Sequence, residues 1–233
     1  MKKTTKSALV ILYYFIYSVM IYIPFVILNI NTSTIPDNLF NIYYVSTEVI
    51  FFISLFYIYR KDFMNYINDF KENGKSHLRM GLKYWLIGLG VMIISNILIS
   101  TLSPISLPEN EQAVREALKL SPLFIAFSSV INAPVIEEIL FRKTLFDVFK
   151  NKKIFIIFSG LLFGSFHIIG VATSLASWLY VIPYAALGMA FAYSYVKTKN
   201  LLTPICLHAF HNFITIIQIL LLMWGLQWRK NGT

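Results

Sequence analysis

Residues 120–141 read LSPLFIAFSSVINAPVIEEILF, a run in which Glu137 and Glu138 are the only charged side chains. A helix rises about 1.5 Å per residue, so roughly 20 apolar residues cross the hydrocarbon core of a bilayer. This stretch is long enough to do so. It therefore predicts a transmembrane helix that carries two adjacent carboxylates.

The rest of the chain has the same character. It is 57% hydrophobic and 13% charged over 233 residues, which is more apolar surface than a soluble domain usually hides from water. Seven runs are long and apolar enough to cross a bilayer, so we expect an all-α, polytopic transmembrane helical bundle of about seven spanning helices, with an eighth left open. The runs are residues 8–30, 40–59, 82–101, 120–141, 154–172, 174–196 and 201–225.

Basic residues fall almost wholly on one side of these runs. With the N-terminus in the cytoplasm, 16 of the 20 lysines and arginines lie in cytoplasmic segments, as the positive-inside rule requires. The other four are Arg115, Lys119, Arg229 and Lys230. This pattern predicts a multi-pass cell-membrane protein, and it accounts for the net charge of +9 without a nucleic-acid partner. Heavy use of Phe, Tyr, Ile, Lys and Asn indicates an AT-rich bacterial genome.

The chain is expected to form a single integrated membrane domain with two unequal parts. Residues 1–119 are interpreted as scaffold helices and loops, and residues 120–225 as the core that carries the chemistry. Residues 60–79 are predicted to be a solvated cytoplasmic loop. Residues 102–119 are predicted to be an outer connector whose second half forms a short interfacial helix. Glu48, alone in an apolar run, is assigned to a structural hydrogen bond.

The first polar cluster is Glu137-Glu138-x-x-x-Arg142. An ionisable group at mid-helix in a bilayer costs about 2.5–3.5 kcal/mol, so each one demands a reason. Glu138 and Arg142 are four residues apart on one helical face and are expected to form an ion pair. Glu137 points about 100° away and is left as the carboxylate that accepts and returns a proton.

Two further clusters follow on later runs. His167 lies beside Ser159, Gly160, Gly164 and Ser165, whose small surfaces allow close helix contact. His208 and Asn212 share one helical face, while His211 is assigned to packing. Counting residues from the nearest cytoplasmic lysines permits Glu137, His167 and His208 to share one layer, in a site open toward the cytoplasm. The lone Cys206 is interpreted as a buried hydrophobe.

Three motifs in this order, Glu-Glu-x-x-x-Arg, Phe-x-x-x-His and His-x-x-x-Asn, resemble the CPBP family, the CAAX-protease and bacteriocin-processing group also called Abi. The resemblance covers residues 120–224. Lys143 stands where family members usually carry glycine, and seven runs are counted where the similar type II CAAX prenyl endopeptidase has eight helices.

The resemblance implies an intramembrane endopeptidase acting on a peptide precursor or a membrane-anchored protein. It implies that Glu137 and His167 activate a water, that His208 and Asn212 stabilise the oxyanion, and that Glu138 and Arg142 position the base. No cofactor is expected, although zinc held by Glu137, His167 and His208, with Glu138 as a further ligand, is left open.

Other intramembrane proteases lack support, because the chain has no Gly-x-Ser-Gly motif, no His-Glu-x-x-His motif and no aspartate inside a predicted span. Two other classes of function stay open. One is a non-enzymatic membrane regulator or immunity protein that keeps the fold, and the other is a proton-coupled transporter. The sequence does not name the substrate or the oligomeric state.

Overall fold

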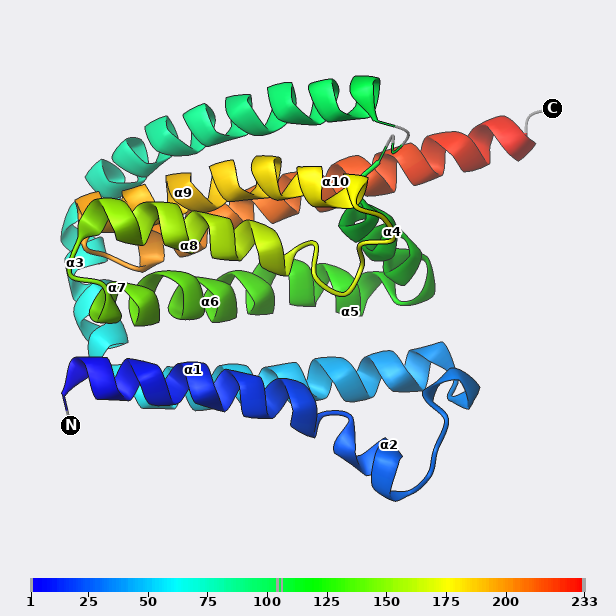
Figure 1. The fold of residues 1–233 in the computed structure, drawn as a ribbon, viewed down its shortest axis with the longest axis horizontal. Helices are drawn as coiled ribbons and strands as arrows, with labels where there is room; N and C mark the ends of the chain where they lie inside the picture. The colour runs from blue at the N-terminus through cyan, green and yellow to red at the C-terminus, as the bar shows by residue number, and fades with distance from the viewer. Residues whose placement is uncertain (1, 104, 106, 232–233) are drawn as a thin grey trace.

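The computed structural model describes residues 2–103, 105 and 107–231, without the side chains of residues 33, 37 and 226–231. The described chain is almost wholly helical and contains no strand (Figure 1), which confirms the predicted all-α fold. Arg229 and Lys230, assigned above to the outer side, have side chains outside the described residues.

The α-helices are α1 Lys3–Met20, α2 Ile23–Ile27, α3 Asp37–Leu102, α4 Glu109–Leu120, α5 Pro122–Phe127, α6 Ala133–Glu138, α7 Leu145–Val148, α8 Lys152–Phe166, α9 Val181–Thr198 and α10 Leu202–Asn231. The shorter turns are η1 Thr32–Thr34, η2 Ser128–Asn132, η3 Ile139–Thr144 and η4 Ala176–Tyr180.

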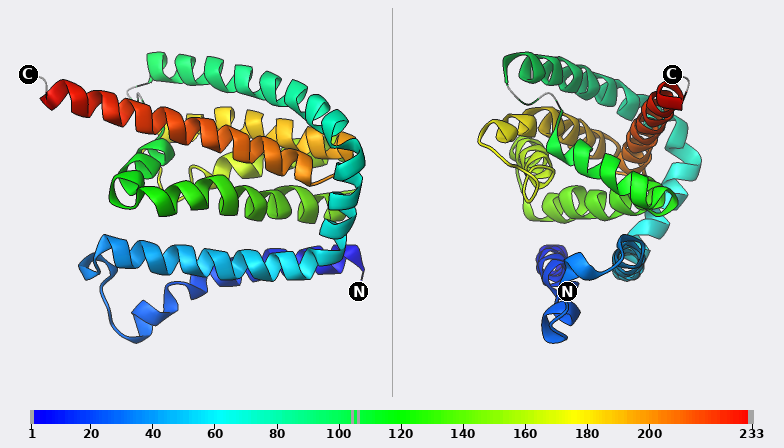
Figure 2. Two further views of the ribbon diagram at one scale, coloured as in Figure 1. Left: turned by 180° about the vertical axis from the view of Figure 1, so that it is seen from behind. Right: turned by 90° about the vertical axis from the view of Figure 1, so that its right-hand side faces the viewer.

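Helix α3 is a single helix of 66 residues that bends back on itself. Figures 1 and 2 show its two long arms running in opposite directions, joined by a segment that crosses one end of the bundle. The arms contain the predicted runs 40–59 and 82–101, so the prediction of a loop at residues 60–79 is wrong. The segment contains no proline and several good helix formers, and its high charge is compatible with a helix.

The buried amide of Asn200 holds this joining segment against the end of α9. Asn200 Nδ2 donates to the carbonyl oxygen of Tyr66 at 2.8 Å and to Asp69 Oδ2 at 2.7 Å. His77 Nε2 also lies 2.8 Å from Asp69 Oδ2. Part of the segment is therefore packed rather than solvated, contrary to the expectation for residues 60–79.

Five helical stretches of the described chain are long and apolar enough to cross a bilayer, judged by length and composition. They are Lys3–Ile27, Asn38–Leu102, Pro122–Val148, Ala176–Thr198 and Leu202–Gly225. The predicted count of seven spans is not confirmed. Two of the predicted runs lie in α3, and α8 has only 15 residues.

The stretch Pro122–Val148 is a continuous helix widened at two places. The segments η2 and η3 are π-helical and flank α6, which carries Glu137 and Glu138. Pro134 has no backbone N–H, so a regular helical bond is missing here and a wider turn is favoured. Each π-turn rotates the side chains that follow it, and such turns occur often at functional sites.

Helices α8 and α9 approach closely through small residues. A Cβ added at Gly164 would lie 2.6 Å from the carbonyl oxygen of Val181, and one added at Gly160 would lie 2.9 Å from that of Ala185. The predicted close contact at Gly160 and Gly164 is confirmed. It fixes the position of the C-terminal end of α8, where His167 follows.

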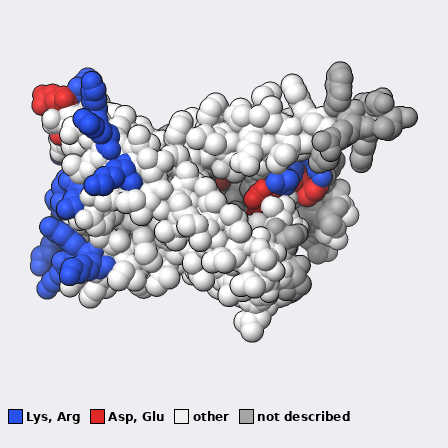
Figure 3. All heavy atoms as spheres, turned by 90° about the horizontal axis from the view of Figure 1, so that it is seen from above, with Lys and Arg blue, Asp and Glu red and all other residues white. Residues whose placement is uncertain are grey.

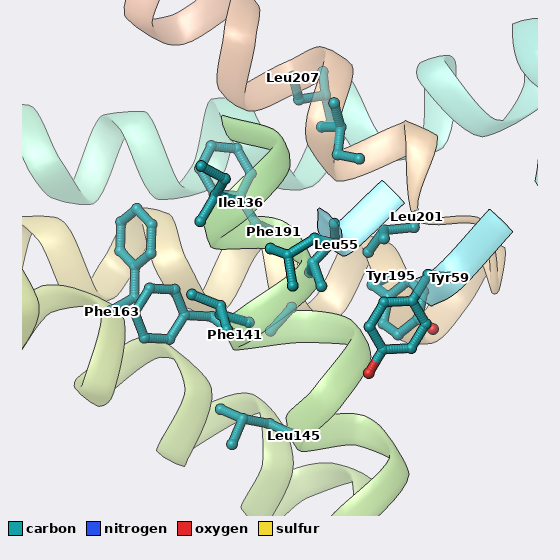
Figure 4. Packing of buried hydrophobic residues seen from close by; sticks show 14 of the residues in the cluster. Leu55, Tyr59, Ile136, Phe141, Leu145, Phe163, Phe191, Tyr195, Leu201 and Leu207 are labelled. Atoms are coloured by element: carbon teal, nitrogen blue, oxygen red, sulfur yellow. The ribbon is translucent and has the colours of Figure 1, made fainter. Parts of the chain in front are cut away.

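One apolar core joins the N-terminal helices to the later ones (Figure 4). Leu55 and Tyr59 of α3 pack in the same buried cluster as Phe141, Phe163 and Phe191. The helices of residues 1–119 therefore share a core with those of residues 120–225.

Lysines and arginines gather at one end of the molecule, as Figure 3 shows. Part of this charge is paired between helices. Lys6 of α1 lies 3.4 Å from Asp62 of α3, and the buried Lys143, the departure from the family pattern, pairs with Asp147 at 2.5 Å. Paired basic residues at this end are compatible with an interfacial location.

Candidate functional site

A cavity of about 510 Å³ brings the three predicted polar clusters together. Its lining includes Glu137 of α6, His167 at the end of α8, and His208 and Asn212 of α10. These residues come from three helices that are separate in the sequence. Glu137, His167 and His208, which the residue count allowed to share one layer, therefore line one cavity.

Glu138 and Arg142 form a fully buried ion pair behind this cavity. Arg142 Nε lies 2.8 Å from Glu138 Oε2, and both side chains are 0% exposed. Arg142 Nη1 also donates to Ser159 Oγ at 3.0 Å, and Ser159 donates to the carbonyl oxygen of Phe141. The predicted ion pair is confirmed, and it joins η3 to α8 across the core.

Glu137, the residue before Glu138, is partly exposed and lines the cavity instead of being buried in an ion pair. Its side chain is 26% exposed and lines the cavity, with Oε2 lying 3.9 Å from His208 Nε2. That separation is too long for a hydrogen bond, and Oε2 has no hydrogen-bond partner among the described residues. The carboxylate is therefore free to accept a proton from a group inside the cavity.

His208 is positioned by the buried ion pair. Its Nδ1 lies 3.0 Å from Glu138 Oε1, and its ring stacks on Phe191 with centroids 5.0 Å apart. A carboxylate accepts only, so Nδ1 carries a proton and Nε2 is directed to Glu137. A ring that carries protons on both nitrogens would donate Nδ1–H to Glu138 and present Nε2–H to the cavity.

His167 follows the last residue of α8 rather than lying in mid-helix. The predicted run to residue 172 is too long, because the helix ends at Phe166 and the chain turns before Gly170, whose φ is 87°. His167 Nδ1 lies 2.9 Å from the carbonyl oxygen of Phe163, and the ring stacks on Tyr184. The carbonyl fixes the proton on Nδ1 and leaves the Nε2 lone pair available.

Asn212 has one of its two amide hydrogens committed. Its Nδ2 donates to the carbonyl oxygen of Ser129 at 2.8 Å, in the π-turn η2. This bond sets the plane of the amide and leaves a second N–H. His211 also lines the cavity, beside Trp85, so packing is not its whole environment.

Glu48 is a cavity residue that the sequence reasoning set aside. Ser128 Oγ donates to its Oε2, which confirms the expected structural hydrogen bond, but Glu48 also lines the cavity with Glu137. The signal that points to it is a lone carboxylate in an apolar run. Tyr14 and Tyr44, both from the expected scaffold, line the same space.

The cavity reaches α4 and not the lysine-rich end. Its lining includes Asn110, Glu111 and Val114 of α4, which lies at the opposite end of the bundle in Figure 1. Figure 3 shows acidic and basic side chains in a hollow far from the main basic cluster. The expected opening toward the cytoplasm stays a prediction, whereas α4 is a wall of the site rather than a plain connector.

The residues considered for zinc do not form a ligand set as placed. Within the part of the chain that the structure describes, no three His, Cys, Asp or Glu side chains are grouped so as to hold a metal ion. Glu137, His167 and His208 share the cavity, but His208 Nδ1 is already held by Glu138. Cys206 is exposed, contrary to the expectation of burial, and lies on the outside of α10.

Comparison with known proteins agrees with the motifs. Residues 119–214 match the family model described as type II CAAX prenyl endopeptidase Rce1-like, which confirms the resemblance over that segment. The chain is 34% identical over 115 residues to a Bacillus subtilis protein named putative membrane peptidase YdiL, covering 48% of this chain and 43% of that protein. It is 26% identical over 134 residues to the UPF0177 protein YvdC of Lactococcus lactis, covering 57% of this chain and 49% of YvdC.

An uncharacterized protein of Mycoplasma capricolum is 30% identical over 162 residues, covering 65% of this chain and 46% of its own length. The chain thus spans less than half the length of each of these curated relatives. No solved structure gives a significant match.

Proposed function

Because residues 119–214 are an Rce1-like segment of a multi-pass membrane protein, we propose that the chain is an intramembrane endopeptidase. It would hydrolyse a peptide bond in a peptide precursor or in a membrane-anchored protein. The observation that carries this proposal is the contrast between two adjacent carboxylates. Glu138 is neutralised by Arg142, whereas Glu137 faces the cavity with a free oxygen.

In the proposed reaction, Glu137 removes a proton from a water that attacks the scissile carbonyl carbon. The Nε2 lone pair of His167 holds that water, because Nδ1 is engaged with Phe163. Negative charge then develops on the carbonyl oxygen. His208 as an imidazolium and the second N–H of Asn212 donate to it, and Glu137 returns the proton to the leaving amine.

Glu138 and Arg142 act as positioning residues in this scheme. Glu138 holds the His208 ring through Nδ1, and Arg142 holds Glu138 through its ion pair. Their burial removes both from direct contact with substrate. Arg142 also packs 4.9 Å from the centre of the Phe163 ring, one turn before His167.

We further propose that no metal takes part. The Nδ1 atoms of His167 and His208 are already held by Phe163 and Glu138, and no three of the described His, Cys, Asp or Glu side chains are grouped as metal ligands. Incubation with a zinc chelator, followed by gel filtration, should leave peptidase activity within about two-fold of the starting value. Loss of activity that is restored by added zinc would contradict this part of the proposal.

The N-terminus is proposed to lie in the cytoplasm, with the α4 end of the cavity toward the outer side. The basic cluster at the opposite end supports this orientation. In a Cys206→Ser background, cysteine placed at Lys119 should react with a membrane-impermeant maleimide on intact cells, and cysteine placed at Lys150 should not. The reverse labelling pattern would overturn the orientation.

The peptidase proposal is tested by substituting the two residues that activate water. Glu137→Ala and His167→Ala should each lower cleavage of a membrane-peptide pool by at least about 100-fold. Both proteins should still insert and accumulate. His77→Ala is the matched control, because His77 contacts Asp69 on α3 and does not line the cavity.

Wild-type cleavage by both variants would exclude the proposed mechanism. Comparing membrane-associated peptides of a deletion strain with those of its parent would identify the substrate. A membrane regulator would show no difference in peptides, and a proton-coupled transporter would show flux in proteoliposomes without cleavage.

A further inference from the structure

Glu48 is a carboxylate in the first apolar arm of α3, and it faces the same cavity as Glu137. Its Oε2 accepts a hydrogen bond from the hydroxyl of Ser128. A hydroxyl is neutral, so it occupies a lone pair without compensating the charge. Charged groups inside a bilayer are expensive, and one without a counter-ion calls for a functional reason.

The other carboxylates around the cavity are matched by arginines. Glu138 pairs with Arg142, and Glu111 of α4 pairs with Arg115 at 2.5 Å. Glu48 and Glu137 have no Lys or Arg within 4.0 Å among the described side chains.

The described lining residues include three glutamates but no lysine or arginine, in a chain whose net charge is +9. Because Glu111 is paired with Arg115, Glu48 and Glu137 are the described lining carboxylates that have no arginine or lysine partner.

Two tyrosines line the same cavity as Glu48. Tyr44 precedes Glu48 by four residues and shares its helical face, and Tyr14 of α1 also lines the cavity. The Tyr14 ring is 6.3 Å from the ring of Phe166, the residue before His167. The faces of tyrosine rings attract cations, so tyrosines that line a cavity together with a carboxylate can contribute to binding a cation.

We propose that Glu48, Tyr14 and Tyr44 form a subsite for a cationic group of the substrate, an ammonium or a guanidinium, next to the bond that Glu137 cleaves. This inference rests on the proposed peptidase function. A cationic group would supply the counter-charge that Glu48 lacks and would donate charge-assisted hydrogen bonds to it. A neutral group of the same size would desolvate the half-buried Glu48 carboxylate without supplying a counter-charge.

Two parts of a peptide have this chemistry: a lysine or arginine side chain and the free N-terminus. The experiment uses binding rather than cleavage. Full-length His167→Ala protein in lipid nanodiscs is equilibrated with an equimolar decapeptide library, and retained peptides are quantified by mass spectrometry. One arm compares lysine with acetyl-lysine at a fixed position, and a second arm compares free with acetylated N-termini.

We expect the charged form to be retained about ten-fold more than its acetylated form in one of the two arms, which identifies the source of the cation. Glu48→Gln should bring that ratio close to one. Glu116→Gln should keep it, because Glu116 is on the exposed side of α4, pairs with Lys119 and does not line the cavity. Thermal unfolding of each variant checks that it is folded.

Equal retention of charged and acetylated peptides in both arms by the parent protein would overturn the subsite, and this comparison requires no substitution at Glu48. A preference that survives in folded Glu48→Gln protein would overturn it as well. The peptidase proposal fails separately. A wild-type protein that cleaves nothing but retains the charge preference contradicts the peptidase and supports the subsite.

Discussion

His208 Nδ1 lies 3.0 Å from Glu138 Oε1, and this contact links α10 to α6 through two fully or nearly fully buried groups. The same carboxylate pairs with Arg142, which reaches Ser159 of α8. A single buried network therefore sets the position of helices that each contribute to the cavity. The proposed catalytic geometry and the stability of the fold both depend on this network, whereas the adjacent Glu137 lies outside it and faces the cavity.

Replacing Glu138 should destabilise the protein, whereas replacing Glu137 should abolish cleavage with little change in stability. Glu138→Gln leaves Arg142 buried without a counter-charge, and we expect a loss of about 3–5 kcal/mol in the free energy of unfolding. Glu137→Gln removes a partly exposed carboxylate that pairs with no arginine, so stability should change by less than about 1 kcal/mol while cleavage is lost. Thermal unfolding in detergent and peptide cleavage, measured on the same preparations, distinguish the two. Equal destabilisation by both substitutions would mean that Glu137 is also a structural group.

Arg142 should not be replaceable by lysine. Its guanidinium reaches Glu138 and Ser159 at once and lies over the Phe163 ring, whereas an ammonium is a point charge that cannot span these groups in a plane. We expect Arg142→Lys to lower the unfolding temperature clearly and to weaken cleavage through misplaced His208. Arg115→Lys is the matched control. Arg115 makes a partly exposed pair with Glu111, so this substitution should leave the unfolding temperature nearly unchanged. An unfolding temperature unchanged by Arg142→Lys would argue against the buried network.

The local part of this site follows from the sequence. The spacing of Glu138 and Arg142 on one helix predicts their ion pair, and the small residues Gly160 and Gly164 predict close contact with a neighbouring helix. Counting residues from the lysines permits Glu137, His167 and His208 to share one layer if the helices tilt differently. Each of these inferences uses only the rise and rotation of a single helix.

The remaining features depend on how separate helices are rotated about one another, which a single sequence does not fix. Whether Glu48 faces the cavity or the lipid is a question of the rotation of α3. The role of α4 as a wall depends on how the chain folds back after Leu102. The charge of residues 60–79 fits a helix as well as a loop, because lysine, glutamate and arginine are good helix formers.

Close contact between α8 and α9 should make Gly164 intolerant of any side chain. A methyl group there would lie 2.6 Å from the carbonyl oxygen of Val181, which cannot move without shifting α9. Gly164→Ala should therefore destabilise the protein by about 1–3 kcal/mol and displace His167, three residues later. Gly90→Ala is the control, because among the described residues nothing lies within 4 Å of the added methyl, and alanine favours the helix by up to about 1 kcal/mol. A folded, fully active Gly164→Ala protein would contradict the packing.

Glu109, at the start of α4, is expected to make the attachment of α4 to the segment after His167 dependent on pH. Thr173 and Ser177, from the segment that follows His167, donate hydrogen bonds to Glu109 Oε1. Burial raises the pKa of Glu109, but the bonds from Ser177 and Thr173 outweigh it and hold the pKa below the ordinary value of 4.5. Because the pKa is lower in the folded state, the stabilising contribution is complete above pH 4.5 and is lost as the pH falls through the depressed value.

The measurement is the pH at which α4 becomes susceptible to limited proteolysis. In wild-type protein, susceptibility should rise as the pH falls below about 4.5. In Glu109→Gln protein it should be raised already at neutral pH and change little on acidification, because glutamine cannot ionise and holds Ser177 and Thr173 more weakly. Glu116→Gln, which removes an exposed carboxylate of the same helix, should follow the wild-type curve. A wild-type and a Glu109→Gln curve that coincide would show that this carboxylate does not anchor α4.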